Sequence, residues 1–322
     1  MNLHTYTEQF LTLVNFTAEH FQILPAFIEK DYWITRSLQR MAQNKNAEKV
    51  VFKGGTALSK AFRLTNRFSE DIDIAVIDAN SMTGNQLKML IKRLAKDMAN
   101  DLEEKVTQGV TSKGSKFYRS IYLYPNFNNT DTSTVKLGQL LIEINTYGNP
   151  YPYVKQEISS FIGDYLTVIN RPDLLVQYDL NPFTINVLDK RRTILEKLVS
   201  LLRFSFSENI QTALAGKIRH FYDLYFLTND NECANYIHSS AFYGYLQELF
   251  AHDQTEFNEP KGWIDKTINE SPLLDNFPSL WQELRSIYQT ELQPLAFIEI
   301  PDEKQIEKVF MKLAERIKKG FI

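Results

Sequence analysis

The sequence has little of what many metal centres and covalent active sites need. Among its 322 residues there are one cysteine, Cys233, and five histidines. A single cysteine excludes an internal disulfide and a zinc site built from cysteines, and it suits a reducing compartment. The histidines are scattered along the chain, and neither a Ser-His-Asp triad nor a zinc ligand set can be assembled from them. A Walker-type phosphate loop is also missing.

Long apolar runs and an excess of one charge are missing as well. No apolar run approaches the length of a membrane span, so we expect no membrane association. The N-terminal MNLHTYTEQF lacks the basic start and apolar core of a signal peptide, so we expect a cytoplasmic protein. The 36 basic and 39 acidic residues give a net charge of −3. Contact with nucleic acid would therefore depend on local basic patches.

What is present is typical of a soluble globular protein, with 43% hydrophobic and 23% charged residues. Apolar spacing predicts an α+β protein, with an α/β domain and its N-terminal helices over residues 1–188 and a helical domain over 189–322. In the first domain we expect helices within 2–45 and at 56–62 and 81–108, and strands at 49–52, 71–77, 117–124, 138–147, 154–158 and 183–188. In the second we expect helices at 191–204, 210–227, 233–251, 280–292 and 302–319.

The stretch from Lys53 to Ile74 places two adjacent glycines before a helical segment. A strand that ends at Gly54-Gly55 and leads into a helix exposes backbone N–H groups, and glycine leaves room for a phosphate oxygen. The same pair can equally be a tight turn, with Thr56 as a helix cap. The glycines by themselves are a weak signal.

Asp71 and Asp73 strengthen it, because residues two apart in a strand lie on the same face, about 7 Å from one another. Two carboxylates on one face repel unless a cation lies between them. Magnesium takes one or two carboxylates together with the phosphates of a substrate. The pattern therefore predicts a metal site that holds a nucleoside triphosphate. The alternatives are a solvated edge strand and an ion pair of Asp71 with Arg67.

Glu143 is a candidate third metal ligand. It lies in the apolar stretch LLIEIN, where an unpaired carboxylate is costly. If this strand lies beside that of Asp71 and Asp73, Glu143 can complete a metal-binding trio. Otherwise a nearby lysine or arginine neutralises it.

These residues match a known family. Gly-Gly-Thr-Ala-Leu at 54–58, followed by Phe-Ser-Glu-Asp-Ile-Asp-Ile at 68–74, resembles the AbiEii/AbiGii-type (MenT-like) nucleotidyltransferase toxins of the DNA polymerase β-like superfamily. The segments IEKDYW (28–33), ILEKLVSLLR (194–203) and KIRHFYDLYFL (217–227) resemble further motifs of that family. Together the segments span about two thirds of the chain in the expected order.

The resemblance implies a nucleotidyltransferase fold and specific site residues. The catalytic set is Asp71, Asp73, Lys197 and Asp223, and the nucleotide-binding set is Gly54, Gly55, Thr56, Ser69 and Arg219. By itself Lys197 lies off the buried stripe of its helix, as a solvated lysine does. Arg219 and Asp223, spaced i and i+4, by themselves indicate an intrahelical ion pair. His220 stands where many members have an acid, and we assign it no chemistry.

The activity implied is transfer of a nucleotide from a nucleoside triphosphate to an acceptor hydroxyl, with Mg²⁺ or Mn²⁺ at the carboxylates and the site in a cleft between the core and the C-terminal helices. The resemblance also implies the toxin of a bacterial toxin–antitoxin pair, with a cognate antitoxin as a partner. Some members act on the 3′ end of tRNA, so RNA is the expected acceptor. The alternatives are transfer to a protein hydroxyl and nucleotide binding without catalysis.

Two short basic clusters are the candidate contacts for RNA phosphates, although such clusters are usually solvated surface. They are Lys190-Arg191-Arg192 and the group Lys113, Lys116 and Arg119. Trp33, Trp263 and Trp281 are expected in the core rather than as platforms for stacked bases.

Overall fold

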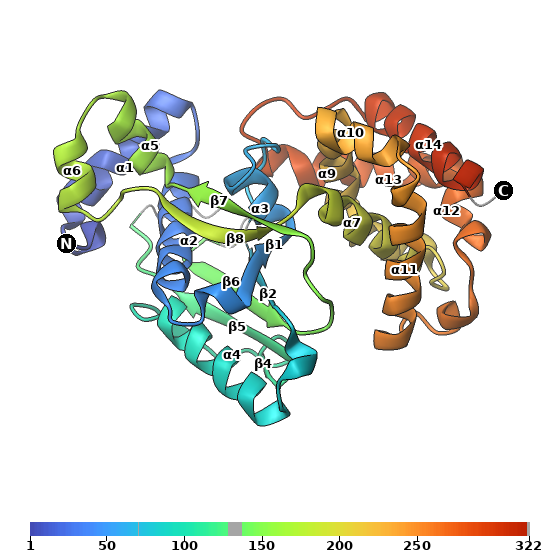
Figure 1. Ribbon diagram of the computed structural model, residues 1–322. Helices are drawn as coiled ribbons and strands as arrows, with labels where there is room; N and C mark the ends of the chain where they lie inside the picture. Colours follow the sequence, from blue (N-terminus) through green and yellow to red (C-terminus); the bar gives the residue numbers. More distant parts are fainter. Residues whose placement is uncertain (70, 128–136, 321–322) are drawn as a thin grey trace. The chain divides into compact units, whose positions relative to one another are not determined.

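The computed structural model describes residues 1–69, 71–127 and 137–320 (Figure 1). The chain divides into two compact units. The first consists of Met1–Arg63 and Phe68–Leu188, and the second of Leu64–Arg67 and Asp189–Ile322. A mixed sheet together with many helices confirms the expected α+β class.

The first unit is built on one mixed β-sheet whose described strands follow the order β3-β5-β6-β2-β1-β8-β7, with β4 also paired to β5. The strands are β1 (Val50–Lys53), β2 (Asp71–Val76), β3 (Glu103–Lys105), β4 (Ser112–Lys113), β5 (Phe117–Leu123), β6 (Gln139–Asn145), β7 (Tyr153–Ile158) and β8 (Phe183–Leu188). β2 runs antiparallel to β1 and parallel to β6. The strand that carries both aspartates is therefore central in the sheet.

The described helices of this unit are α1 (Thr7–Phe21), α2 (Pro25–Gln43), α3 (Gly54–Lys60), α4 (Gly84–Met98), α5 (Phe161–Val168) and α6 (Pro172–Gln177). α2 and α4 contact each other, and both contact β6. Ile72, Ile74, Ile142 and Ile144 are fully buried in the core. Because side chains alternate along a strand, the residues between these isoleucines lie on the opposite face of the sheet.

Buried charges in α2 tie three helices of the first unit together. Lys60, the last residue of α3, forms an ion pair of 2.5 Å with Asp31 of α2 and donates to the carbonyl oxygen of Ser159 at 2.9 Å. The other oxygen of Asp31 accepts a hydrogen bond of 2.9 Å from the backbone N–H of Phe161, the first residue of α5. This network fixes the C-terminal end of the helix that begins at Gly54.

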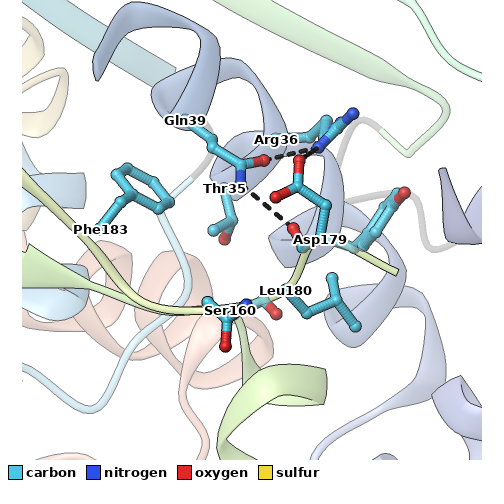
Figure 2. Close-up of a pocket in the computed structure, with 9 residues that line it drawn as sticks. Thr35, Arg36, Gln39, Ser160, Asp179, Leu180 and Phe183 are labelled. Atoms are coloured by element: carbon cyan, nitrogen blue, oxygen red, sulfur yellow. Dashed lines mark hydrogen bonds and ion pairs between the residues drawn. The ribbon is translucent and has the colours of Figure 1, made fainter. Parts of the chain in front are cut away.

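A small pocket beside α2 contributes to packing rather than to substrate binding (Figure 2). Arg36 of α2 pairs with the carboxylate of Asp179 at 3.0 Å, and the Gln39 side chain donates to the Asp179 carbonyl oxygen at 3.1 Å. The enclosed volume is about 10 Å³. That is room for about one water molecule.

The second unit is helical. Its described helices are α7 (Lys190–Phe204), α8 (Ile210–Ala215), α9 (Ile218–Asn229), α10 (Asn231–His238), α11 (Ala241–Glu256), α12 (Pro272–Asp275), α13 (Phe277–Leu292) and α14 (Glu303–Gly320). Phe221 of α9 packs against Phe277 and Trp281 of α13 and Phe310 of α14, with ring centroids 5.1–5.6 Å apart. Trp33, Trp263 and Trp281 are buried, as predicted.

Several predicted element boundaries were wrong. The helix expected over 81–108 ends at Met98, and residues 103–105 instead form β3, which pairs with β5. The helix expected over 210–227 is interrupted at Gly216 and Lys217, and the one over 233–251 at Ser239 and Ser240. The asparagine-rich sequence of residues 125–131 predicts a polar turn or loop, of which residues 128–131 lie outside the described part of the chain.

Candidate active site

Four charged residues lie next to one another across four strands of the first unit. The strand register pairs Lys53 with Asp73, Asp73 with Glu143, and Glu143 with Arg119. Residues paired in this way project from the same face of the sheet. Asp71 lies on that face as well, two residues before Asp73. The row has the charges plus, minus, minus and plus, with two carboxylates side by side at its centre.

Glu143 has a cationic neighbour. Its carboxylate forms an ion pair of 2.8 Å with Arg119, which agrees with the alternative that a nearby arginine neutralises it. Within the described residues, no group of three or more His, Cys, Asp or Glu side chains is arranged to hold a metal ion. Asp71 and Asp73 still provide two carboxylates on one face, the donor set that magnesium takes when phosphates supply further oxygens. The two aspartates therefore fit a metal ion, and metal binding by Glu143 stays a prediction.

Gly54 is required by the position of the Asp73 carboxylate. The φ angle of Gly54 is +82°, and a Cβ atom added to it would lie 2.2 Å from the Oδ2 atom of Asp73. A side chain at this position would meet both backbone strain and a collision. The glycine that follows β1 therefore leaves the space that the Asp73 carboxylate occupies.

The other predicted nucleotide-binding residues of this unit have different surroundings. The hydroxyl of Thr56 is buried and donates to the backbone carbonyl oxygen of Asp71, which joins α3 to the start of β2. Gly55 and Ser69 are half-buried. The Thr56 side chain therefore has a structural partner, while Gly55 and Ser69 are partly accessible.

In the second unit, Asp223 of α9 is fully buried between two cations. Arg67 donates to its two oxygens from Nε and Nη2, each at 2.9 Å, and Lys197 of α7 donates to Oδ2 at 2.6 Å. Lys197 is only 5% exposed, so the prediction of a solvated lysine was wrong. Arg67 and Lys197 therefore hold this carboxylate, and an intrahelical pair of Arg219 with Asp223 stays a prediction. Arg219 itself is half-buried.

The charges of this cluster set its protonation states. Burial alone would raise the pKa of Asp223, but the attraction of Arg67 and Lys197 outweighs it and lowers that pKa below its usual range. His220 lies close by, and burial, followed by the charge of Lys197, lowers its pKa well below the usual value. Asp223 is therefore ionised and His220 neutral at physiological pH.

Arg67 has a place in this cluster that the sequence does not predict, because its sequence context suggests only a pair with Asp71. Its signal in the sequence is its position within the same motif, four residues before Asp71. Arg67 forms a β-bridge to Ala296, and the segment Leu64–Arg67 belongs to the second unit.

The two basic clusters expected to contact RNA phosphates are largely neutralised by local acids. Lys190 pairs with Asp230 at 2.8 Å and with Glu232 at 3.1 Å. Arg191 pairs with the Asp189 carboxylate at 2.6 Å, Lys113 with Glu104 at 2.8 Å, and Arg119 with Glu143 as described. These ion pairs reduce the positive charge available to a phosphate backbone.

Comparison with protein families identifies the chain. Residues 36–308 match the family described as nucleotidyl transferase AbiEii toxin, type IV TA system. The chain belongs to the AbiEii nucleotidyltransferase toxin family. This confirms the resemblance found in the motifs, and the protein is a nucleotidyltransferase. The matched range contains every residue to which the motifs gave a role. No curated protein matched the sequence.

Two solved structures are similar to the chain at low sequence identity. One is described as a nucleotidyltransferase from H. pylori, with 17% identity, a TM-score of 0.44, and coverage of 91% of this chain and 95% of the other. The second is MenT4, a nucleotidyltransferase toxin from Mycobacterium tuberculosis, with 14% identity, a TM-score of 0.40, and coverage of 95% and 97%. Among the described helices of the present structure, none has the length and hydropathy needed to cross a membrane.

Proposed function

We propose that this AbiEii family member transfers a nucleoside monophosphate from a nucleoside triphosphate to a hydroxyl of RNA, with the 3′ end of tRNA as the acceptor, and that it acts in this way as a toxin controlled by a cognate antitoxin. The observation that carries the proposal is the pair Asp71 and Asp73 on one face of β2, with the Asp73 carboxylate placed where Gly54 has no side chain. This arrangement suits an oxygen-rich, phosphate-binding metal site.

In the first unit, Asp71 and Asp73 would hold Mg²⁺ or Mn²⁺. When bound, such an ion supplies positive charge that offsets the charge of the phosphates. Gly54 keeps a side chain away from the Asp73 carboxylate, and Gly54 and Gly55 would leave backbone N–H groups for phosphate oxygens. Lys53 and Arg119 flank the two central carboxylates of the row and limit their mutual repulsion in the absence of a ligand.

In the second unit, Lys197 is the candidate cation for the departing pyrophosphate. The acceptor hydroxyl oxygen attacks the α-phosphorus, the bond to the β-phosphate oxygen breaks, and pyrophosphate leaves with the bonding electrons while the hydroxyl proton passes to solvent. A lysine can follow the charge that develops on the leaving group. Asp223, held by Arg67, orients the Lys197 ammonium through their hydrogen bond of 2.6 Å.

Labelled nucleotides test the proposal directly. We would incubate the purified protein with each α-³²P-labelled nucleoside triphosphate, Mg²⁺, and either total RNA or total protein. We expect label in RNA of tRNA size, dependent on the divalent ion and absent for Asp73→Asn. Label in protein alone would replace RNA by a protein acceptor. Failure of the folded wild-type protein to label either fraction would contradict the assigned activity.

A further inference from the structure

A groove in the first unit lies beside α4, at the far end of β2 from the aspartates. It has a volume of about 560 Å³ and is lined by Lys45, Asn46, Glu48, Lys49, Ile77, Asp78, Ser81, Met82, Gln86, Met89, Leu90 and Arg93. β2 extends for about 10 Å from Asp73 to its last residue, Val76, and Asp78 lies in the turn beyond that end. The groove is therefore separate from the carboxylates that would bind the nucleotide.

The cations of this groove differ from the basic clusters singled out in the sequence. Lys45, Lys49 and Arg93 are exposed, and within the described part of the chain none of them forms an ion pair. Lys155 pairs with Glu48 at 2.9 Å and offsets that acid of the lining. Asp78 is the other acid of the lining, so three cations outnumber it and the groove carries net positive charge, on a molecule whose net charge is −3.

α4 extends this positive surface. Its core-facing residues include Leu87, Leu90 and Leu94, and its exposed face carries Lys88, Lys92 and Lys96 beside Met89 and Arg93 of the groove. Lysines four residues apart on a helix lie in a row, with about 6 Å between neighbours. The α4 lysines and the groove cations together form one basic surface, which we call the α4 surface.

We propose that the α4 surface binds the sugar–phosphate backbone of the acceptor RNA, away from its reacting 3′ end; this rests on the proposed transfer to RNA. Lysine, arginine, asparagine, glutamine and serine are the side chains that contact nucleic-acid phosphates, and the groove contains all five types. Protein interfaces are instead centred on aromatic and other large apolar anchors. The residues that line the groove include no aromatic side chain, and of the apolar ones only Met89 is exposed, which favours RNA over an acidic protein.

Binding of RNA without nucleotide tests this surface separately from catalysis. The probe is fluorescently labelled unfractionated tRNA, titrated with full-length protein at several salt concentrations. The test variant is Lys45→Gln/Lys49→Gln/Arg93→Gln. The matched control is Lys304→Gln/Lys308→Gln/Lys312→Gln on α14, which removes the same charge from three exposed lysines. Glutamine has nearly the helix propensity of lysine, so both variants should fold.

We expect the test variant to bind tRNA about tenfold or more weakly, and its slope of log affinity against log salt to fall by about 2–3, because each lost phosphate contact removes about one unit or slightly less. The control should bind like the wild type. Equal affinity of the test variant and the control for tRNA would overturn the inference. A larger loss of affinity in the control would overturn it as well. Transfer of labelled nucleotide to RNA by the wild type is measured in parallel. If transfer occurs but the test variant binds normally, the α4 surface is wrong while the proposed function stands. If the test variant loses affinity for tRNA but the wild type transfers no nucleotide, the α4 surface binds RNA while the proposed transfer is wrong.

Discussion

Gly54 lies so close to the Asp73 carboxylate that we expect its replacement to affect both stability and activity. Gly54→Ala would place a methyl group 2.2 Å from the Asp73 carboxylate, in a backbone conformation with φ of +82°. Left-handed backbone costs a residue with a side chain about 1–2 kcal/mol, and displacement of Asp73 adds to that. We expect a lower melting temperature together with loss of nucleotide transfer.

Gly262 provides the matched control, because it has the same φ of +82° and no atom within 4 Å of an added Cβ. Gly262→Ala should show the backbone cost alone and keep its activity. If Gly54→Ala retains full transfer, or if both variants lose it equally, the carboxylate of Asp73 does not need the space that Gly54 leaves.

The buried carboxylate of Asp223 should make stability depend on pH. Arg67 and Lys197 lower its pKa below the value of about 3.9 expected for an unfolded chain. The ionised group therefore stabilises the fold at pH values above about 4, and this contribution is lost as the pH falls towards the folded pKa. Asp223→Asn removes it at every pH. At pH 7 the cost should be on the order of 3 kcal/mol, since two buried cations lose their counter-charge.

Urea unfolding at pH 7 and pH 3 measures this difference. The difference in free energy of unfolding between wild type and Asp223→Asn should be smaller at pH 3 than at pH 7. Asp265→Asn, at an exposed position, shows how much this difference changes with pH for an aspartate without buried partners. A gap that stays constant between the two pH values would mean that Asp223 is not held as an anion by Arg67 and Lys197.

Single residues also show where sequence reasoning fails. The strand alternation around Asp71 and Asp73 correctly placed isoleucines in the core and carboxylates on the other face, because the period of a strand fixes this. Lys197 was expected at the surface because the apolar stripe of its helix excludes it. The partner that makes its burial favourable, Asp223, lies 26 residues away, and no local period reports such a pair.

At the scale of elements, the network around Asp31 predicts how the glycine turn is held. Asp31→Asn would leave Lys60 with a weakened partner in a buried site and weaken the bond to the start of α5. Removal of one partner from a buried ion pair costs up to about 3–5 kcal/mol. We expect a loss of about 2 kcal/mol or more in free energy of unfolding.

The exposed pair of Arg171 with Asp173 is the control, with side chains 47% and 59% accessible. Asp173→Asn should change the free energy of unfolding by less than about 1 kcal/mol, as surface ion pairs do. Both variants are compared by urea denaturation. Equal small losses would show that the Asp31 network does not fix the C-terminal end of α3.

Helices and strands were predictable where one face is apolar over several turns or where residues alternate, as in α4, β2 and β8. Their ends were less so. The apolar spacing continues past Met98 to Leu102, but pairing with β5 draws residues 103–105 into a strand. α8 and α9 have compatible stripes, and the break at Gly216 follows from the low helix propensity of glycine.

For the whole molecule, the question is whether residues of the two units serve one reaction. Lys197→Met keeps much of the buried apolar stem but removes the charge, while Arg67 still binds Asp223. If Lys197 stabilises the departing pyrophosphate, this change should lower kcat by about 10²–10³. Lys197→Arg should rescue poorly, because a planar guanidinium replaces a compact ammonium. Asp73→Asn should reduce transfer at least as much, with a nearly unchanged melting temperature.

The double variant Asp73→Asn/Lys197→Met decides the matter. If Asp73 and Lys197 act as a unit on the transition state, they lose their effects together, so the double variant should be no slower than the slower single variant. Independent contributions would multiply instead. Rates are measured with saturating tRNA and nucleoside triphosphate, with melting temperatures recorded alongside. Wild-type rates in Lys197→Met would show that Lys197 takes no part in the chemistry. Multiplied losses would mean that Asp73 and Lys197 contribute independently and do not act as one unit.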